Sequence, residues 1–192
     1  MTRRWQRLKG ILRSLRMYYW PPGAGRRLDD FYRPLVPEGG LCFDIGAHVG
    51  NRTASWRRLG ARVVAVEPQP DFARLLRWLF ARDPGVTLVE AAVAGVEGEI
   101  ELHLSPATPT VTTASRDFID DAAAIGSFRE VRWAEPIRVP ALTLDRLIAE
   151  HGRPDFVKID IEGLEDAALA GLSEPVPLLS FEFLAGAVPR AK

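Results

Sequence analysis

A lysine and two carboxylates stand close together in the segment 158–163, which reads KIDIEG. The apolar residues before and between them predict a strand over 156–161. Alternate side chains of a strand share a face, so Lys158, Asp160 and Glu162 are expected to point the same way. Carboxylates at the end of a strand can accept a proton, orient a hydroxyl or hold a divalent metal. Asp160 could instead cap the next helix, with Glu162 near its N-terminus.

A glycine-containing turn, GAHVG over 46–50, follows the apolar run 41–45. Glycines permit a tight turn and the close approach of a ligand to the backbone. The spacing is Gly-x-x-x-Gly and differs from the Gly-x-Gly-x-x-Gly of pyrophosphate binders. A helix expected at 51–59 would offer free N–H groups to a carboxylate or another anion. A tight turn without a ligand is the alternative interpretation.

An acidic residue, Glu67, ends the second predicted strand at 62–66, about twenty residues after the glycine turn. At that place a carboxylate can accept hydrogen bonds from both hydroxyls of a ribose. Pro68 then fixes the turn. A glutamate exposed on the surface is the alternative.

Strand and helix signals alternate from residue 41 onward, which predicts an α/β fold with a mostly parallel, Rossmann-like sheet and ligands at the carboxyl ends of its strands. Asp71 is expected to cap the second of the helices. The stretch 99–104 alternates like an antiparallel strand, and 105–136 reads as a long loop or lid. The remaining expected strands are 86–89, 139–142 and 178–183, and the remaining expected helices are 71–82, 144–150 and 164–172.

Five short motifs occur in a fixed order along the chain. This series resembles that of the FkbM methyltransferase family over roughly residues 41–183. The resemblance implies a class I methyltransferase fold, S-adenosylmethionine as cofactor, and O-methylation of a hydroxyl on a sugar, a polyketide or a similar natural product. The motifs are Phe43–Gly50, Val66–Pro68, Glu90–Ala94, Leu142–Asp145 and Lys158–Gly163.

The same resemblance assigns roles to individual residues. Asp160 and Glu162 would be catalytic and would face the sulfonium and the acceptor. Asp160 would also bind the cofactor. Because the methyl carbon is already electrophilic, the enzyme would mainly align an acceptor oxygen behind it, and a carboxylate would take the hydroxyl proton. The other expected cofactor-binding residues shape the amino-acid pocket, hold the ribose and lie beside the adenine: Asp44, Gly46, Ala47, His48, Gly50, Glu67, Pro68 and Ala92.

The chain departs from the family pattern in two places. His48 stands where the family usually has Asn, and since both residue types tolerate positive φ, we expect a role in the turn rather than as a base. Family members usually continue past the fifth strand with another helix and a β-hairpin, whereas this sequence stops nine residues after Phe183. A shortened C-terminal end with an exposed sheet edge is therefore expected.

The first 36 residues are expected to form a basic amphipathic helix and a linker, ahead of a methyltransferase domain at 37–192. Apolar residues recur at helical spacing, and arginines fill the other face. The helix could dock on the domain or on a partner subunit, or it could lie on an anionic membrane surface. The apolar stripe consists of Trp5, Leu8, Leu12, Leu15 and Tyr19.

Bulk composition sets limits on the function. The 192 residues carry 25 basic and 25 acidic side chains, so a general attraction to nucleic acid is not expected. A single cysteine, Cys42, in an apolar run fits a buried thiol in a reducing cytoplasm. We found no apolar run of eighteen residues and no signal-peptide core, so a soluble cytoplasmic protein is expected.

Three alternatives remain open at this stage. A nicotinamide-dependent oxidoreductase would share the acidic residue after the second strand, although the glycine spacing argues against it. A non-catalytic binding protein could use a shortened sheet to pair with a partner. No resident metal is expected, but Asp160, Glu162 and Glu182 could approach one another as oxygen ligands of Mg²⁺.

Overall fold

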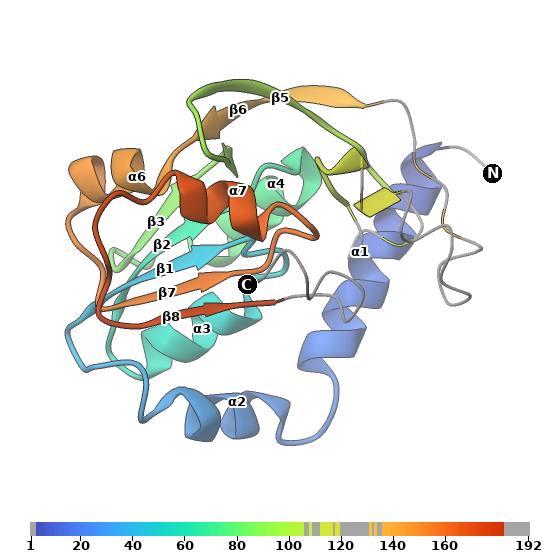
Figure 1. Cartoon of the computed structure of the whole chain (residues 1–192). Helices are drawn as coiled ribbons and strands as arrows, with labels where there is room; N and C mark the ends of the chain where they lie inside the picture. The colour runs from blue at the N-terminus through green and yellow to red at the C-terminus, as the bar shows by residue number, and fades with distance from the viewer. Residues whose placement is uncertain are drawn as a thin grey trace.

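The computed structural model describes most of the chain (Figure 1). The described residues are 3–105, 108, 112–116, 118–119, 131, 133 and 136–182. Most of the predicted loop at 105–136, and Phe183 at the end of the last predicted strand, lie outside them.

The core is a five-stranded sheet in the order β3-β2-β1-β7-β8, in which every neighbouring pair is parallel. The chain starts at the central strand, builds outward to β3, and later returns to the other side of β1. This order creates a switch point between the carboxyl ends of β1 and β7, where ligands bind in open α/β sheets. The strands are β1 (Leu41–Ile45), β2 (Arg62–Val66), β3 (Val86–Val89), β7 (Phe156–Ile159) and β8 (Leu179–Phe181).

One face of the sheet packs against α2 (Ala24–Tyr32), α3 (Asn51–Arg58) and α4 (Pro70–Leu79). The fully buried Trp56 of α3 lies edge-to-face against Tyr32 of α2 and Phe156 of β7, with ring centroids 5.3 and 5.2 Å apart. Aromatic pairs at this geometry add to the free energy gained from burial alone. The segment predicted as a linker therefore contains a helix that contributes to the core.

The opposite face packs against α6 (Leu144–His151) and α7 (Glu165–Ala170). Alternation along the strands separates the two faces: Phe43 and Ile45 of β1 point toward α6 and α7, while Cys42 points toward α3. The thiol of Cys42 is fully buried, as predicted, and burial raises its pKa to about 12.

A second, three-stranded sheet in the order β4-β6-β5 lies beside the first (Figure 1). Its strands are β4 (Ala92–Val93), β5 (Gly98–Leu102) and β6 (Ile137–Leu142). β5 pairs antiparallel with β6, as the alternation at 99–104 predicted, and β4 pairs parallel with β6.

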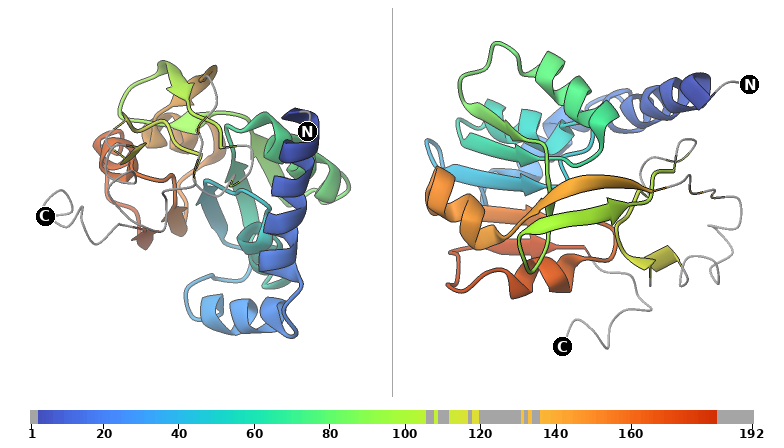
Figure 2. Two further views of the ribbon diagram at one scale, coloured as in Figure 1. Left: turned by 90° about the vertical axis from the view of Figure 1, so that its right-hand side faces the viewer. Right: turned by 90° about the horizontal axis from the view of Figure 1, so that it is seen from above.

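The N-terminal helix α1 (Arg3–Tyr19) lies beyond the carboxyl ends of the parallel strands, beside α4 (Figures 1 and 2). Arg7 forms a bidentate ion pair with Asp71 of α4, with N–O distances of 2.5 and 2.7 Å. The hydroxyl of Tyr19 donates to the carbonyl of Val49 at 3.0 Å. Within the described residues, none of the helices has the length and apolarity that crossing a bilayer requires.

The α/β prediction with a mostly parallel sheet is confirmed, and local boundaries shift by a few residues. The predicted N-cap at Asp71 is wrong: α4 begins at Pro70 after Gln69, because proline is suited to the first helical position. Asp71 binds Arg7 and so fixes α1. Asp160 does not cap α7, whose N-cap position is Leu164.

Candidate active site

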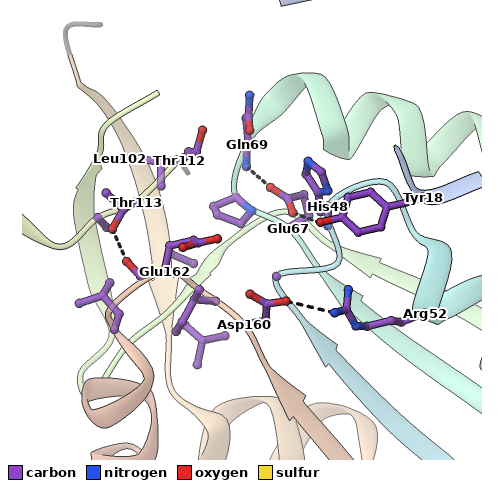
Figure 3. A pocket seen from close by; sticks show the side chains of 17 residues that line it. Tyr18, His48, Arg52, Glu67, Gln69, Leu102, Thr112, Thr113, Asp160 and Glu162 are labelled. Carbon is purple, nitrogen blue, oxygen red and sulfur yellow. Dashed lines mark hydrogen bonds and ion pairs between the residues drawn. The ribbon is translucent and has the colours of Figure 1, made fainter. Parts of the chain in front are cut away.

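A cleft opens at the carboxyl ends of the central strands, and Figure 3 shows its lining. It measures about 720 Å³ when the open space at its mouth is included. The lining comes from α1, the glycine turn, the ends of β2 and β7, and the small sheet. The expected site residues among the lining are Gly46, His48, Glu67, Pro68, Ala92, Asp160 and Glu162.

The glycine turn has left-handed backbone at three positions: φ is 78° at Gly46, 52° at His48 and 73° at Gly50. A Cβ on Gly46 would overlap the carbonyl oxygen of Asp160, so this glycine lets the ends of β1 and β7 meet. The positive φ of His48 confirms the predicted turn role, since His tolerates this region better than most residues. Burial lowers the pKa of the His48 imidazole to about 4, which keeps it neutral.

Glu67 faces the cleft from the end of β2 and is 6% exposed. One carboxylate oxygen accepts a hydrogen bond from the backbone N–H of His48 at 2.7 Å, and the other accepts from that of Gln69 at 2.9 Å (Figure 3). Burial raises the pKa of Glu67 to about 7, and the two hydrogen bonds limit the rise. The carboxylate of Glu67 thus links the glycine turn to the turn that follows β2, and it also borders the cleft.

Below the cleft floor lies a group of buried charges. Lys158 is 4% exposed, and its ammonium lies 3.0 Å from the carboxylate of Asp160 and 3.7 Å from that of Asp44. Asp44 is fully buried and accepts hydrogen bonds from the backbone and hydroxyl of Thr53, at 3.1 and 2.6 Å. The Asp44 side chain therefore anchors α3 and Lys158, and it does not line the cleft.

Asp160 follows β7 directly and borders the cleft. The guanidinium of Arg52 lies 3.6 Å from its carboxylate (Figure 3), and the nearest oxygen is the one that also faces Lys158. Burial disfavours its charge, but Lys158, a hydrogen bond with Glu182 and Arg52 together hold the pKa of Asp160 below its usual value. The same hydrogen bond raises the pKa of Glu182 to about 7. Asp160 is thus a fixed anion.

Glu162 lies past the end of β7, with a left-handed φ of 53°. Strand alternation therefore does not orient it, contrary to the prediction. Its backbone carbonyl accepts a hydrogen bond from the Thr113 hydroxyl at 2.6 Å, and its carboxylate points into the cleft (Figure 3). Burial, followed by the charges of Asp160 and Glu182, raises the pKa of Glu162 to about 8.

Of the ten predicted site residues, seven line the cleft and three do not. Ala47 and Gly50, like Asp44, support the cleft from behind; a Cβ on Gly50 would press on Leu76 of α4 and on Phe80, which follows that helix. Within the described residues, no group of three or more His, Cys, Asp or Glu side chains is arranged to hold a metal.

Several lining residues were not predicted. Tyr18 of α1 borders the cleft and lies edge-to-face against His48, with ring centroids 5.7 Å apart. Arg52 stands in the first turn of the helix after the glycine turn, a position that could have marked it. The other unpredicted lining residues are Gln69, Leu102, Thr112, Thr113, Ala114, Ile161 and Leu164, whereas Val93 belongs to the turn at 91–93 that the family resemblance places beside the adenine.

Residues 44–179, well over half of the chain, match the model of the methyltransferase FkbM domain. The chain belongs to the FkbM methyltransferase family. This membership places the chain among methyltransferase domains that use S-adenosylmethionine, and it gives no support to the nicotinamide alternative. No curated protein matches the chain.

Solved structures that resemble the FkbM chain are distant from it. A precorrin-6y C5,15-methyltransferase from Geobacter metallireducens is 15% identical with a TM-score of 0.47, and a putative RNA methyltransferase from Pyrococcus horikoshii is 14% identical with a TM-score of 0.46. The matches cover 88% and 90% of this chain, but the chain spans only 66% of each of those proteins. The glycopeptide N-methyltransferase MtfA, solved with sinefungin, is 15% identical over 69% of this chain and 82% of its own, with a TM-score of 0.31.

The residues present fit S-adenosylmethionine. Glu67 keeps lone pairs that face the cleft and could accept from ribose hydroxyls, since each carboxylate oxygen accepts more than one hydrogen bond. The fixed negative charge of Asp160 lies on the same wall, where a cationic sulfonium would be stabilised. Ala92 and Val93 of β4 provide a small apolar surface for a purine.

Proposed function

We propose that this FkbM methyltransferase methylates a hydroxyl oxygen of a sugar, a polyketide or a related natural product. The observation that carries the proposal is the carboxyl group of Glu162, which points into the cleft and has a pKa near 8. A general base is most effective when its pKa lies near the working pH. Asp160, by contrast, is committed to Lys158 and Arg52 and has a lowered pKa, so it is the weaker base.

Bound S-adenosylmethionine supplies an electrophilic methyl group on a positively charged sulfur. That sulfur would leave with the C–S electron pair, and the acceptor oxygen would lose its proton as it gains the methyl carbon. Ionised Glu162 takes the proton that the hydroxyl oxygen must lose. Asp160 stays charged throughout and stabilises positive charge beside it. The remaining task of the chain is alignment, which a rigid strand end provides.

The lining supports a hydroxylated acceptor. Thr112, Thr113 and Gln69 line the cleft together with Glu162 (Figure 3). The hydroxyl of Thr112 and the amide of Gln69 can interact with acceptor hydroxyls, whereas the hydroxyl of Thr113 already donates to the carbonyl of Glu162 and accepts from the N–H of Ser115. We also propose that the enzyme acts in the cytoplasm, which its single buried cysteine, Cys42, fits.

The first experiment measures binding of S-adenosylmethionine and S-adenosylhomocysteine by calorimetry. We expect micromolar affinity, weakened at least tenfold by Glu67→Ala, because two backbone turns and the ribose lose their acceptor. Glu99→Ala, on exposed β5, is the matched control and should bind like the wild type. Failure of a folded sample to bind either compound would overturn the cofactor assignment.

The second experiment follows isotope from methyl-labelled S-adenosylmethionine into a panel of hydroxylated sugars and polyketides, with amine analogues beside them. Label on oxygen supports the proposal. Label found only on amines would replace it with N-methylation. Cofactor binding without transfer to any acceptor in the panel would favour a non-catalytic binding protein.

A further inference from the structure

The N-terminal helix α1 has two faces, and the fold covers only one. The covered face carries the small residues Gly10 and Ser14, which are buried, together with Tyr18 at the cleft. These positions are four residues apart and therefore lie along one side of the helix. Arg7, bound to Asp71, lies on the same side. This face allows α1 to approach the domain closely.

The apolar stripe identified in the sequence lies mostly outside this contact. Trp5 is 60% exposed, Leu8 45% and Leu12 56%, and we call these three residues the outer stripe. At 3.6 residues per turn the centre of the outer stripe lies about 150° around the helix from the centre of the covered face. A folded protein rarely leaves a row of large apolar side chains in water without a binding role.

Positive charge borders the outer stripe. Arg13 and Arg16 are exposed on α1, on the flank away from the covered face. Within the first 35 residues the sequence has nine basic side chains and only two acidic ones, of which Asp29 is paired with Arg58. An apolar row with tryptophan, flanked by arginines, is the pattern of helices that lie in a lipid–water interface.

We propose that the outer stripe of α1 binds an anionic membrane surface. The apolar side chains would enter the headgroup region, and Arg13 and Arg16 would contact anionic headgroups. A second copy of the chain is a poorer partner for this face, because a two-fold contact through it would gather the Arg13 and Arg16 side chains of both copies around one interface. Since the covered face of the same helix carries Tyr18, the cleft would then open close to the bilayer.

Co-sedimentation of the full chain with vesicles tests the proposal. We expect binding to vesicles of phosphatidylcholine mixed with phosphatidylglycerol, and little binding to phosphatidylcholine alone. The double substitution Leu8→Ser with Leu12→Ser should lower the partition coefficient on the order of a hundredfold, because two leucines no longer leave water. Arg13→Gln with Arg16→Gln should lower it roughly 30-fold on the anionic vesicles only.

The matched control is an exposed tryptophan elsewhere on the surface. Trp5 is 60% exposed on α1 and Trp78 is 75% exposed on α4. Trp5→Ser should weaken vesicle binding and Trp78→Ser should not, while both keep the thermal midpoint of the wild type. Equal loss with both variants, equal binding to neutral and anionic vesicles, or a dimer that Leu12→Ser dissociates without any lipid binding would each overturn the proposal.

Discussion

The ammonium of Lys158 lies 3.0 Å from the carboxylate of Asp160, and the two residues stand on either side of the point where β7 ends. This contact separates the two carboxylates of the KIDIEG motif. Asp160 is held in one place as an anion, whereas two residues later the backbone turns left-handed, and no cation of the described part of the chain forms an ion pair with Glu162. Two neighbouring carboxyl groups thus acquire opposite pKa shifts, which is the arrangement that assigns different roles to a pair of acids.

Removing Lys158 should destabilise the protein strongly. Lys158→Met would leave the fully buried Asp44 and the half-buried Asp160 without their shared cation, and breaking a buried ion pair costs about 3–5 kcal/mol. We expect the free energy of unfolding, measured in urea at pH 7, to fall by about 3 kcal/mol, the lower end of this range, because Thr53 still donates to Asp44. Adding Asp44→Asn should recover part of the loss. A cost below about 1 kcal/mol would show that the pair contributes little.

Glu162→Gln should abolish methyl transfer while sparing the cofactor site. Loss of a general base lowers turnover about 10²–10⁴-fold, and the affinity for S-adenosylhomocysteine should change less than threefold. In the wild type only the ionised carboxylate accepts a proton, so turnover should rise with pH up to about 8 and then level off. A rate that is independent of pH between 6 and 9, with chemistry limiting, would contradict this role.

The same carboxyl group links stability to pH. The folded-state pKa of Glu162, about 8, exceeds its ordinary value of 4.5, so its contribution is fully present below pH 4.5 and is lost as pH rises through 8. Glu162→Gln has no such loss. Its stability relative to the wild type should therefore increase between pH 5 and 8, by about 1.4 kcal/mol for each unit of pKa difference. If the free energies of unfolding of the two proteins changed with pH in parallel, the raised pKa of Glu162 would be refuted.

The sequence predicted the parts of the site that depend on local order. Glycine turns, acidic strand ends and alternating strands and helices are short-range patterns, and parallel strands bring their ends together, so Gly46, Glu67 and Asp160 meet as expected. The sequence did not predict in the same way which side chains reach the cleft and which are buried behind it. Asp44 belongs to the same motif as Gly46, yet its side chain points to α3 because it lies on the same face of β1 as Cys42.

Contacts between distant segments were also beyond prediction. The helical period of α1 identified an apolar stripe, but the docking face is set by Gly10, Ser14 and the Arg7–Asp71 pair, which no periodicity reveals. Tyr18 reaches the cleft for that reason. Thr113 likewise contacts Glu162 across 49 residues of sequence.

The glycine turn offers a matched pair of substitutions. Gly46 and Gly39 have nearly equal φ, 78° and 73°, so alanine meets similar backbone strain of about 1–2 kcal/mol at either site. At Gly39 a Cβ meets nothing within 4 Å, whereas at Gly46 it overlaps the Asp160 carbonyl. Gly46→Ala should therefore cost at least about 2 kcal/mol more in urea unfolding than Gly39→Ala. Equal costs would mean that the β1 and β7 ends can separate freely.

Tyr18 tests whether α1 is part of the enzyme's binding site. Its ring borders the cleft against His48, and burial, with Asp160 and Glu162 nearby, raises the pKa of its hydroxyl. Tyr18→Ala removes an aromatic ring whose burial against a ligand contributes about 1.5–3 kcal/mol, so binding of the cofactor or the acceptor should weaken at least tenfold. Tyr18→Phe keeps the ring and should stay within about threefold, because the neighbouring charges already have partners in Lys158 and Arg52.

The control for Tyr18 is its neighbour Met17, which is 50% exposed, so Met17→Ala should leave both binding constants unchanged. Calorimetry with S-adenosylhomocysteine measures the cofactor, and KM measures the acceptor once it is identified. A loss confined to KM would assign Tyr18 to the acceptor side of the cleft. Wild-type constants in Tyr18→Ala would show that α1 only covers the domain, and the cleft would then be formed by the α/β core alone.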